Sequence, residues 1–220
     1  MNSVRRSGSP PRVDSDEAFS VSGQTCRPEW TDDQGKPLSC VIATLGALGY
    51  TVDWKILNAL DFGLPQNRER IFIVATDHGR TIDWPSGNDP MKPLSVLLER
   101  NPASRHIVSE RIRQARHNAH QASVTPSIWQ ENKGGNVSSH PLSCTLRAGA
   151  SYNYLLVDGN RRLTPRELFR LQGFPESFVL PKTDAAARRL SGNSVSVPTV
   201  RALIQNVVLR YASRQTTIAV

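Results

Sequence analysis

Residues 164–173 of this 220-residue chain carry both the start and the stop signals of one short helix. Thr164 and Glu167 have the spacing of a capping box, in which each side chain bonds the backbone N–H of the other residue. Pro165 suits the first helical position, and Gly173 suits the residue that ends a helix. The stretch therefore predicts a short helix with fixed ends, packed against a core.

A series of arginines accompanies this helix. Arg162, Arg166 and Arg170 recur at four-residue spacing, which predicts that they line one side of the helix. A rigid basic edge is a candidate for facing phosphate groups. The alternative interpretation is a solvated helix face with no ligand.

The charge of the chain favours nucleic acid as a partner. Its formal net charge is +8 at pH 7 and comes mostly from arginine, whose guanidinium group suits bidentate contacts with phosphate or guanine. A hydrophobic content of 38% is enough for a buried core. The length predicts one domain, or one and a half.

The cysteines and the apolar runs indicate in which cellular compartment the protein is expected. Three widely spaced cysteines without CxxC pairing predict neither a disulfide framework nor a zinc cage, so a reducing compartment is expected. No apolar run approaches a membrane span, and the N-terminus has no signal-peptide core. We therefore expect a cytoplasmic protein that acts away from membranes.

The first third of the chain predicts a leader followed by a helix and two strands. Residues 1–37 are rich in Ser, Pro, Gly and charge, which is typical of a flexible leader. Residues 38–48 have helical spacing and end before Gly49. The patterns at 51–59 and 70–76 predict strands, the second of them buried on both faces.

The middle region, residues 83–160, is polar and only loosely periodic, as expected of a small recognition module built from loops on short strands. One short helix is predicted at 94–100, followed by a basic segment. His117 and His120 have helical spacing, but no acidic or cysteine partner lies at ligand spacing. No metal site is expected.

Two polar clusters are candidates for binding. Gln66, Arg68 and Arg70 alternate along an extended segment, so their side chains are expected on one side of it. They form a candidate anion or base-edge site, and the open alternative is an exposed turn with salt-bridged arginines. The second candidate is the sharp break at 191–195, between predicted helices at 182–190 and 198–212, where backbone N–H groups and the Asn193 amide offer ligand contacts. Such a turn alone is more often a helix cap.

Three segments, in this order, resemble the carboxyl-terminal half of the DNA cytosine-C5 methyltransferases. They are Phe62-Gly63-Leu64-Pro65-Gln66-Asn67-Arg68-Glu69-Arg70 with the strand after it, Leu163-Thr164-Pro165-Arg166-Glu167 with Leu171-Gln172-Gly173-Phe174-Pro175, and Gly192-Asn193-Ser194-Val195. The resemblance covers the chain from about Leu38 onwards. It implies an α/β fold, the C-terminal part of a Rossmann-like sheet that serves S-adenosylmethionine-dependent methylation, with a small, mostly β and loop target-recognition domain inserted. Residues 38–82 and 161–220 would then belong to the catalytic domain, and residues 83–160 to the recognition domain.

The resemblance also implies roles for single residues, with S-adenosylmethionine as cofactor and double-stranded DNA as partner. The residues matching the motif whose arginines face the flipped cytosine and the catalytic loop are Gln66, Arg68 and Arg70. Those matching the turn beside the methionine part of S-adenosylmethionine are Asn193, Ser194 and Val195. Thr145 and Leu146 match the pair that touches the DNA backbone beside the target. Arg162 and Arg166 match the segment that sets the recognition domain against the catalytic domain.

The nucleophile of the family has no counterpart here. C5 methylation needs a thiolate that attacks C6 of an extruded cytosine, and in the family this cysteine follows a proline. Cys26 follows Thr, Cys40 follows Ser, and Cys144 follows Ser. The family's Glu-Asn-Val segment and Gly-rich donor-binding turn also lack a match.

Three hypotheses follow. The chain is one subunit of a split methyltransferase whose complementary N-terminal subunit carries the cysteine; or it is an inactive, truncated methyltransferase; or it is a DNA-binding module without catalysis. In each case the two strands at 51–59 and 70–76 are expected to form the edge hairpin of a sheet whose other strands are absent. Such a hairpin leaves apolar surface uncovered.

Overall fold

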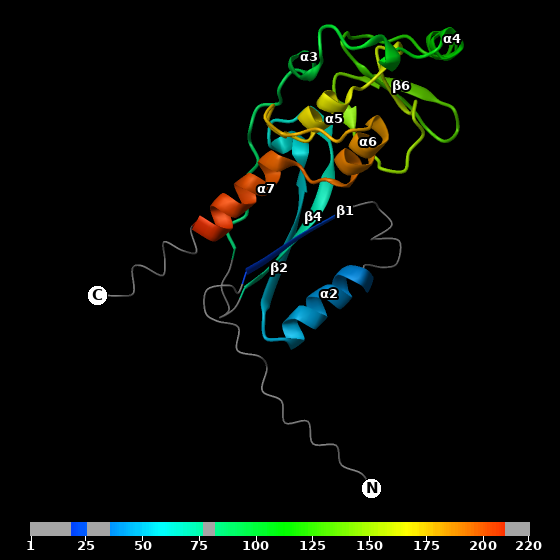
Figure 1. The fold of residues 1–220 in the computed structure, drawn as a ribbon. Coiled ribbons are helices and arrows are strands. Elements are labelled where there is room, and N and C mark those ends of the chain that lie inside the picture. The colour runs from blue at the N-terminus through cyan, green and yellow to red at the C-terminus, as the bar shows by residue number, and fades with distance from the viewer. Residues whose placement is uncertain (1–18, 26–35, 77–81, 210–220) are drawn as a thin grey trace. The chain divides into compact units, whose positions relative to one another are not determined.

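The computed structural model describes residues 19–25, 36–76 and 82–209 (Figure 1). The chain divides into two compact units. The first comprises residues up to Lys55 together with Phe72–Ile82, and the second comprises Ile56–Ile71 together with Asp83 onwards. The finer division predicted at residues 38, 83 and 161 stays a prediction.

The first unit is built on a three-stranded sheet with the order β1-β4-β2. Its strands are β1 (Phe19–Thr25), β2 (Thr51–Asn58) and β4 (Glu69–Thr76). The Thr76 hydroxyl donates to the Thr51 carbonyl at one end of the pair, and the Ala59 N–H donates to the Arg68 carbonyl at the other. Strands β2 and β4 are therefore an antiparallel hairpin, and the two predicted strands are confirmed.

Strand β1 is an addition to the predicted elements. The sequence predicts no strand before residue 38, because the alternating apolar residues Phe19 and Val21 make too short a run to mark one. In the structure β1 pairs with β4, so the hairpin gains a third strand. The remainder of the predicted leader, residues 1–18 and 26–35, lies outside the described part of the chain.

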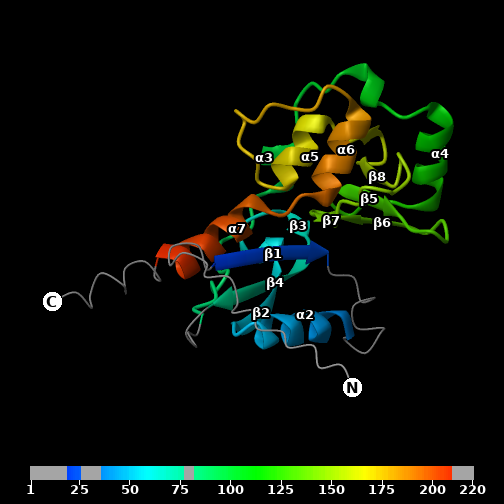
Figure 2. The same cartoon turned by 60° about the horizontal axis from the view of Figure 1, so that its bottom comes forward.

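Helix α2 (Lys36–Ala47) lies beside this sheet, as Figures 1 and 2 show, and confirms the predicted helix. Gly49 has a φ of +92°, and the Tyr50 N–H donates to the Leu45 carbonyl (3.2 Å), so the helix ends as the glycine predicts. No side chain described in α2 is fully buried, and Val41 is 37% exposed. The expected packing of this helix is therefore only partial.

The second unit contains a four-stranded antiparallel sheet with the order β6-β5-β8-β9. Its strands are β5 (Ile128–Glu131), β6 (Val137–His140), β8 (Leu155–Val157) and β9 (Arg161–Arg162). Side chains alternate between its faces: Ile128 and Leu155 pack in one hydrophobic cluster, whereas Trp129 and Leu156 pack in another. Two further strands, β3 (Gln66–Asn67) and β7 (Ser143–Cys144), pair in parallel.

Five α-helices lie in the described part of the second unit. They are α3 (Leu94–Leu97), α4 (Glu110–Ala119), α5 (Pro165–Leu171), α6 (Asp184–Asn193) and α7 (Val197–Ile204), which continues as a π-helical turn (Gln205–Leu209). Helices α3, α5, α6 and α7 were predicted, whereas α4 was predicted only as a basic segment. Among the described residues, none of the helices is long and apolar enough to cross a membrane.

Helix α5 has the ends that its sequence specifies. The Glu167 N–H donates to the Thr164 hydroxyl (3.2 Å), and the Thr164 N–H donates to the Glu167 carboxylate (2.8 Å), which completes the capping box. The same buried carboxylate accepts two hydrogen bonds from Arg161, both 2.8 Å, and one from the Glu99 backbone (2.8 Å). Glu167 therefore fixes the start of α5 and joins it to β9 and to the segment after α3.

Gly173 ends α5 at a position where only glycine fits. Its φ is +79°, and a Cβ atom there would lie 2.4 Å from Cδ of Pro198. We expect Gly173→Ala to lower the free energy of unfolding by about 2 kcal/mol or more, because it adds both backbone strain and a clash. A urea titration followed by circular dichroism measures this.

The matched control is Gly149→Ala in the same unit, where a Cβ atom meets nothing within 4 Å. It should change the unfolding free energy by less than about 1 kcal/mol. Equal effects of the two substitutions would contradict the packing described for Gly173.

Candidate functional site

The guanidinium group of Arg68 joins three segments that lie far apart in the sequence. Arg68 is 2% exposed, and it donates to the backbone carbonyls of Leu146 (3.0 Å), Gly192 (2.8 Å) and Ser194 (2.5 Å). The first carbonyl belongs to the segment after β7, and the other two belong to the end of α6 and the turn after it. The structure thus brings together three groups of residues that the sequence analysis singled out separately.

The dipoles of these backbone carbonyls stabilise the positive charge of Arg68. Burial, and next the positive charge of Arg70, lower the pKa of Arg68 to about 9. The guanidinium group is still protonated at neutral pH, and its hydrogen bonds to backbone carbonyls are charge-assisted. Removing it would leave three inward-facing carbonyls without this donor.

Gln66 and Arg70 are buried beside Arg68. Gln66 is 0% exposed and Arg70 is 4% exposed. The alternative of an exposed, solvated turn is therefore wrong for this segment, because flanking elements cover all three side chains. Arg70 donates to the Glu69 carbonyl (2.6 Å).

Polar atoms of this cluster are unpaired. Neither the amide nitrogen nor the amide oxygen of Gln66 has a hydrogen-bond partner among the described residues, and Nε of Arg68 has none either. Each buried polar group without a partner costs about 1–3 kcal/mol. Among the described residues, Gln172 Oε1 and Arg116 Nη1 are the other buried side-chain atoms without a partner, so Gln66 differs in having both of its amide atoms unpaired.

The turn at residues 191–195 is held from two sides. The Gln172 side chain donates to the Ser191 carbonyl (3.0 Å), and the Gln172 carbonyl accepts from the Val197 N–H (2.8 Å). A Cβ atom at Gly192 would lie 2.4 Å from the Ala148 nitrogen, so glycine allows the segment after β7 to pass close to α6. The sequence did not single out Gln172, although it belongs to the Leu-Gln-Gly-Phe-Pro segment.

The prediction that the helix ends at residue 190 and the chain breaks at residue 191 is wrong. Helix α6 continues to Asn193, because Ser191 and Gly192 are buried against neighbouring segments rather than released into a loop. The chain leaves the helix only at Ser194. Asn193 is exposed at this helix end.

Asn193, Ser194 and Val195 line an open groove of about 620 Å³. Its other walls are mainly apolar side chains of α7 and the segment before α6, including Phe174, Val197, Val200 and Ile204. The groove combines an apolar surface with an amide at its edge. This combination suits a ligand with both an apolar and a polar part.

Thr145 and Leu146 lie on the same segment and differ in accessibility. The Thr145 hydroxyl donates to the Asn67 carbonyl (2.9 Å), and its side chain is partly exposed. Leu146 is 3% exposed and packs in the hydrophobic core beside α5. Of this predicted pair, only Thr145 presents side-chain surface to a ligand.

The predicted basic edge of α5 is only partly present. Arg162 lies on β9, before the helix begins, so the prediction that it lines the helix is wrong. Arg170 pairs with Glu176 (2.7 Å) and lowers the pKa of that carboxylate. Arg166 donates to the Phe178 carbonyl (3.2 Å). The two helix arginines therefore hold the loop after α5 by bonds within the protein.

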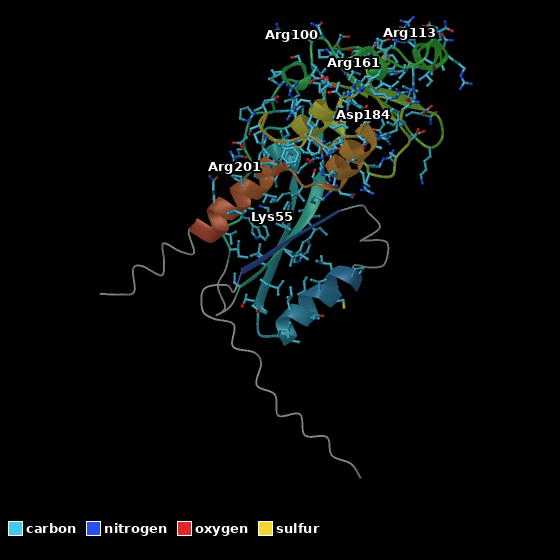
Figure 3. All side chains as sticks on the ribbon, in the orientation of Figure 1. Lys55, Arg100, Arg113, Arg161, Asp184 and Arg201 are labelled. Atoms are coloured by element: carbon cyan, nitrogen blue, oxygen red, sulfur yellow. The ribbon has the colours of Figure 1, made fainter. Side chains whose placement is uncertain are left out.

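His117 and His120 pack around an aromatic ring. Their ring centroids lie 4.8 and 5.1 Å from that of Trp129, and they bond Asn160 and Ser139. In the described ranges, no three His, Cys, Asp or Glu side chains gather as metal ligands would. Figure 3 shows the side chains of the residues that the structure describes, with Arg161 and Asp184 labelled among them.

Comparison with known proteins gives the same class of fold. The chain is similar to the crystal structure of the S. pombe Dnmt2 methyltransferase, with a TM-score of 0.62 and 20% identity over 89% of this chain and 67% of that chain. The fold is therefore the Rossmann-like α/β fold of S-adenosylmethionine-dependent methyltransferases, as the sequence predicted.

Sequence relatives define the family. The chain is 48% identical to the Type II methyltransferase M.NgoBI of Neisseria gonorrhoeae, over 84% of this chain and 59% of the relative. It is 42% identical to the Type II methyltransferase M.HaeII of Haemophilus aegyptius, over 84% of this chain and 60% of the relative. The profile of the C-5 cytosine-specific DNA methylases matches residues 30–136 and 98–208. The chain belongs to this family of DNA cytosine-5 methyltransferases, and it spans about 60% of the length of these relatives.

The unpaired amide of Gln66 gives a test of its role. We expect Gln66→Met to leave the free energy of unfolding unchanged or to raise it by about 1–3 kcal/mol, because the amide atoms make no hydrogen bonds that the substitution could break. The control is Gln172→Met, which breaks the bond to Ser191 and also removes an unpaired amide oxygen. It should leave the chain less stable than Gln66→Met by about 1 kcal/mol in the same urea titration. The reverse order of the two variants would show that Gln66 is a structural residue.

The environment of Cys144 predicts an unreactive thiol. Burial raises the pKa of Cys144 from 9.0 to about 11, and nearby Arg147 offsets only part of this. At pH 8 the thiolate fraction should be roughly 100-fold below that of an ordinary cysteine. Iodoacetamide labelling followed by peptide mass spectrometry should modify the exposed Cys40 first. Rapid labelling of Cys144 at pH 8 would contradict this, and its rate should rise as the pH approaches 11.

Proposed function

We propose that this chain supplies target recognition and part of the S-adenosylmethionine site of a DNA cytosine-C5 methyltransferase. It methylates cytosine only together with a complementary N-terminal chain that carries the nucleophilic cysteine. The observation that carries the proposal is the position of Arg68, whose guanidinium group bonds both the recognition segment at Leu146 and the turn at Gly192 and Ser194. DNA contacts and cofactor contacts are thereby held in register by one side chain.

The cofactor turn fits the proposed role by its chemistry. Asn193 is exposed at the edge of the groove, and Ser194 and Val195 line it. These residues would hold the methionine part of S-adenosylmethionine, with apolar contact to its chain and polar contact to its charged end. When bound, this cofactor supplies the methyl group.

The buried polar cluster is placed on the target side in the proposal. Gln66 and Arg70 would orient the extruded cytosine and the loop that carries the nucleophile, and Arg68 would hold the backbone around them. Fixed donors in a dry site stabilise developing charge without reorganising during the reaction. The unpaired amide of Gln66 supports this, because a further polar partner would complete its hydrogen bonds.

Double-stranded DNA is the proposed substrate. Thr145 would contact the DNA backbone beside the target, and Arg162 and Arg166 would set the recognition sheet against the helices. The net charge of +8 favours binding to phosphate. The Type II methyltransferase relatives suggest a place in a restriction-modification system, with the protein in the cytoplasm and associated with DNA.

The proposed need for a complementary chain rests on the cysteines. None of Cys26, Cys40 and Cys144 follows a proline, and Cys144 is held as a neutral thiol by burial. The exposed side chains of Val41, Leu48 and Trp54 in the first unit are apolar surface that a complementary chain would cover.

A second candidate function is a DNA-binding module without catalysis. It is favoured by the second unit, whose recognition sheet and helices have their own hydrophobic clusters. An inactive, truncated methyltransferase is the third candidate, and it shares the missing nucleophile. A DNA-binding module would bind duplex DNA as an isolated chain, whereas an inactive fragment would not.

Methyl transfer tests the proposal. The isolated chain should incorporate no labelled methyl group from S-adenosylmethionine into duplex DNA, because no activated thiolate is present. Co-expression with an N-terminal methyltransferase chain that carries the Pro-Cys loop should restore incorporation, and Pro-Cys→Pro-Ala in that chain is the matched control. Incorporation of labelled methyl groups by the isolated chain would contradict the proposal. Failure of the two chains to co-purify and to methylate would leave the DNA-binding module or the inactive fragment.

A further inference from the structure

Helix α7 presents a stripe of four residues to the open groove of about 620 Å³. The residues of this stripe that line the groove are Val197, Val200, Arg201 and Ile204. Their spacing of three and four residues places them on one face of the helix. Another face of α7 is buried, where Leu203 is 0% exposed. The groove therefore meets a face of α7 that is apolar except for Arg201.

The charge of Arg201 has no counter-charge in the part of the chain that the structure describes. Among the described residues that line the groove, Arg201 is the only one with a charged side chain. None of the ion pairs between described residues includes Arg201, which is exposed and labelled in Figure 3. An exposed arginine is ordinary on a helix, but this one adds a single positive charge to the wall of a ligand-sized groove.

The position of Arg201 in α7 sets the direction of its side chain. Helix α7 begins at Val197, directly after the turn in which Asn193, Ser194 and Val195 line the same groove. Arg201 follows Val197 by about one helical turn. Long side chains of an α-helix point back toward its N-terminus. The guanidinium group of Arg201 therefore leans toward the end of the groove that this turn forms.

The charges of S-adenosylmethionine differ along its length. Its methionine part carries a carboxylate, which is negative, and an ammonium group, which is positive. The sulfonium group is also positive, and the adenosine part is neutral. A single arginine in the wall attracts the carboxylate and repels both positive groups. The planar fork of a guanidinium group also matches the two oxygens of a carboxylate.

We propose that Arg201 binds the carboxylate of S-adenosylmethionine and thereby sets the direction in which the cofactor lies in the groove. The inference rests on the proposed function, which assigns the methionine part to Asn193, Ser194 and Val195. With the carboxylate at Arg201, the amide oxygen of Asn193 is free to accept from the ammonium group of the same ligand. The apolar stripe of α7 contacts the uncharged carbon chain between them.

Ligand-observed NMR titrations of the complete chain test this with two compounds. Decarboxylated S-adenosylmethionine keeps the adenosine, sulfonium and ammonium groups and lacks only the carboxylate. Arg201→Gln should lower the affinity for S-adenosylmethionine about three- to tenfold, because it removes a charge-assisted contact that solvent partly screens. The same variant should bind decarboxylated S-adenosylmethionine at least as tightly as the unchanged chain does, because a repulsion is removed. The loss for S-adenosylmethionine should shrink at high salt.

Two further variants separate the contact from general electrostatics. Arg189→Gln removes an equal charge from α6, where Arg189 is exposed and does not line the groove. It should change the affinity for either compound by less than about twofold, because salt screens a distant exposed charge. Arg201→Lys keeps the charge without the fork and should bind S-adenosylmethionine more tightly than Arg201→Gln does. Circular dichroism melting of each variant confirms that the fold is retained.

The outcomes separate this inference from the proposed function. If Arg201→Gln weakens both compounds equally, or weakens neither, Arg201 does not bind the carboxylate and the inference is overturned. An equal loss in Arg189→Gln also overturns it, because the effect is then one of overall charge. In each of these cases the unchanged chain still binds S-adenosylmethionine, so the proposed cofactor role of the groove stands. Absence of S-adenosylmethionine binding by the unchanged chain overturns both that role and the inference.

Discussion

Three carbonyls share the guanidinium group of Arg68, and the rest of the second unit depends on this arrangement. Backbone carbonyls at Leu146, Gly192 and Ser194 face inward and accept from the same side chain. A buried carbonyl needs a donor, and the multi-pronged guanidinium group of Arg68 supplies one to both the segment after β7 and the turn after α6. Lysine has a single charged end and does not replace the planar fork. Gly192 completes the arrangement by letting the backbone of Ala148 pass at close range.

Much of the local structure follows from the sequence because it depends on short-range rules. The capping box and Gly173 predict both ends of α5, and the apolar run predicts β4 as a buried strand. Strand β1 and helix α4 are not predicted, because one depends on pairing with β4 and the other carries mostly polar residues. Tertiary contacts, not propensity, order such segments.

The candidate functional site could also be predicted only in part, because it too depends on tertiary contacts. The alternation of Gln66, Arg68 and Arg70 predicts a shared side, but it gives no sign that the partners of Arg68 are backbone carbonyls, since carbonyls leave no signature in a sequence. The contact of Arg188 with the Tyr152 ring is hidden for a related reason, because the two residues come from separate segments that only folding brings together. The four-residue spacing of Arg162 and Arg166 is misleading, because a strand and a helix cap interrupt it.

Two features of the chain fit a protein that works with a further part. The fully buried amide of Gln66 has no partner within the described part of the chain, and the first unit exposes Val41, Leu48 and Trp54. Both are costs to an isolated fold, and both are removed by a partner that supplies polar and apolar contacts. The chain belongs to the cytosine-C5 methylase family and spans about 60% of the length of the relatives named above.

The central claim, that Arg68 couples the segment after β7 to the turn after α6, is tested most directly by amide hydrogen exchange in Arg68→Lys. The account predicts faster exchange in two separate segments, residues 144–150 and 191–198, while exchange in the β5–β6 hairpin stays unchanged. Unchanged exchange in both segments, or an increase in only one of them, would contradict the claim that one guanidinium group holds them together.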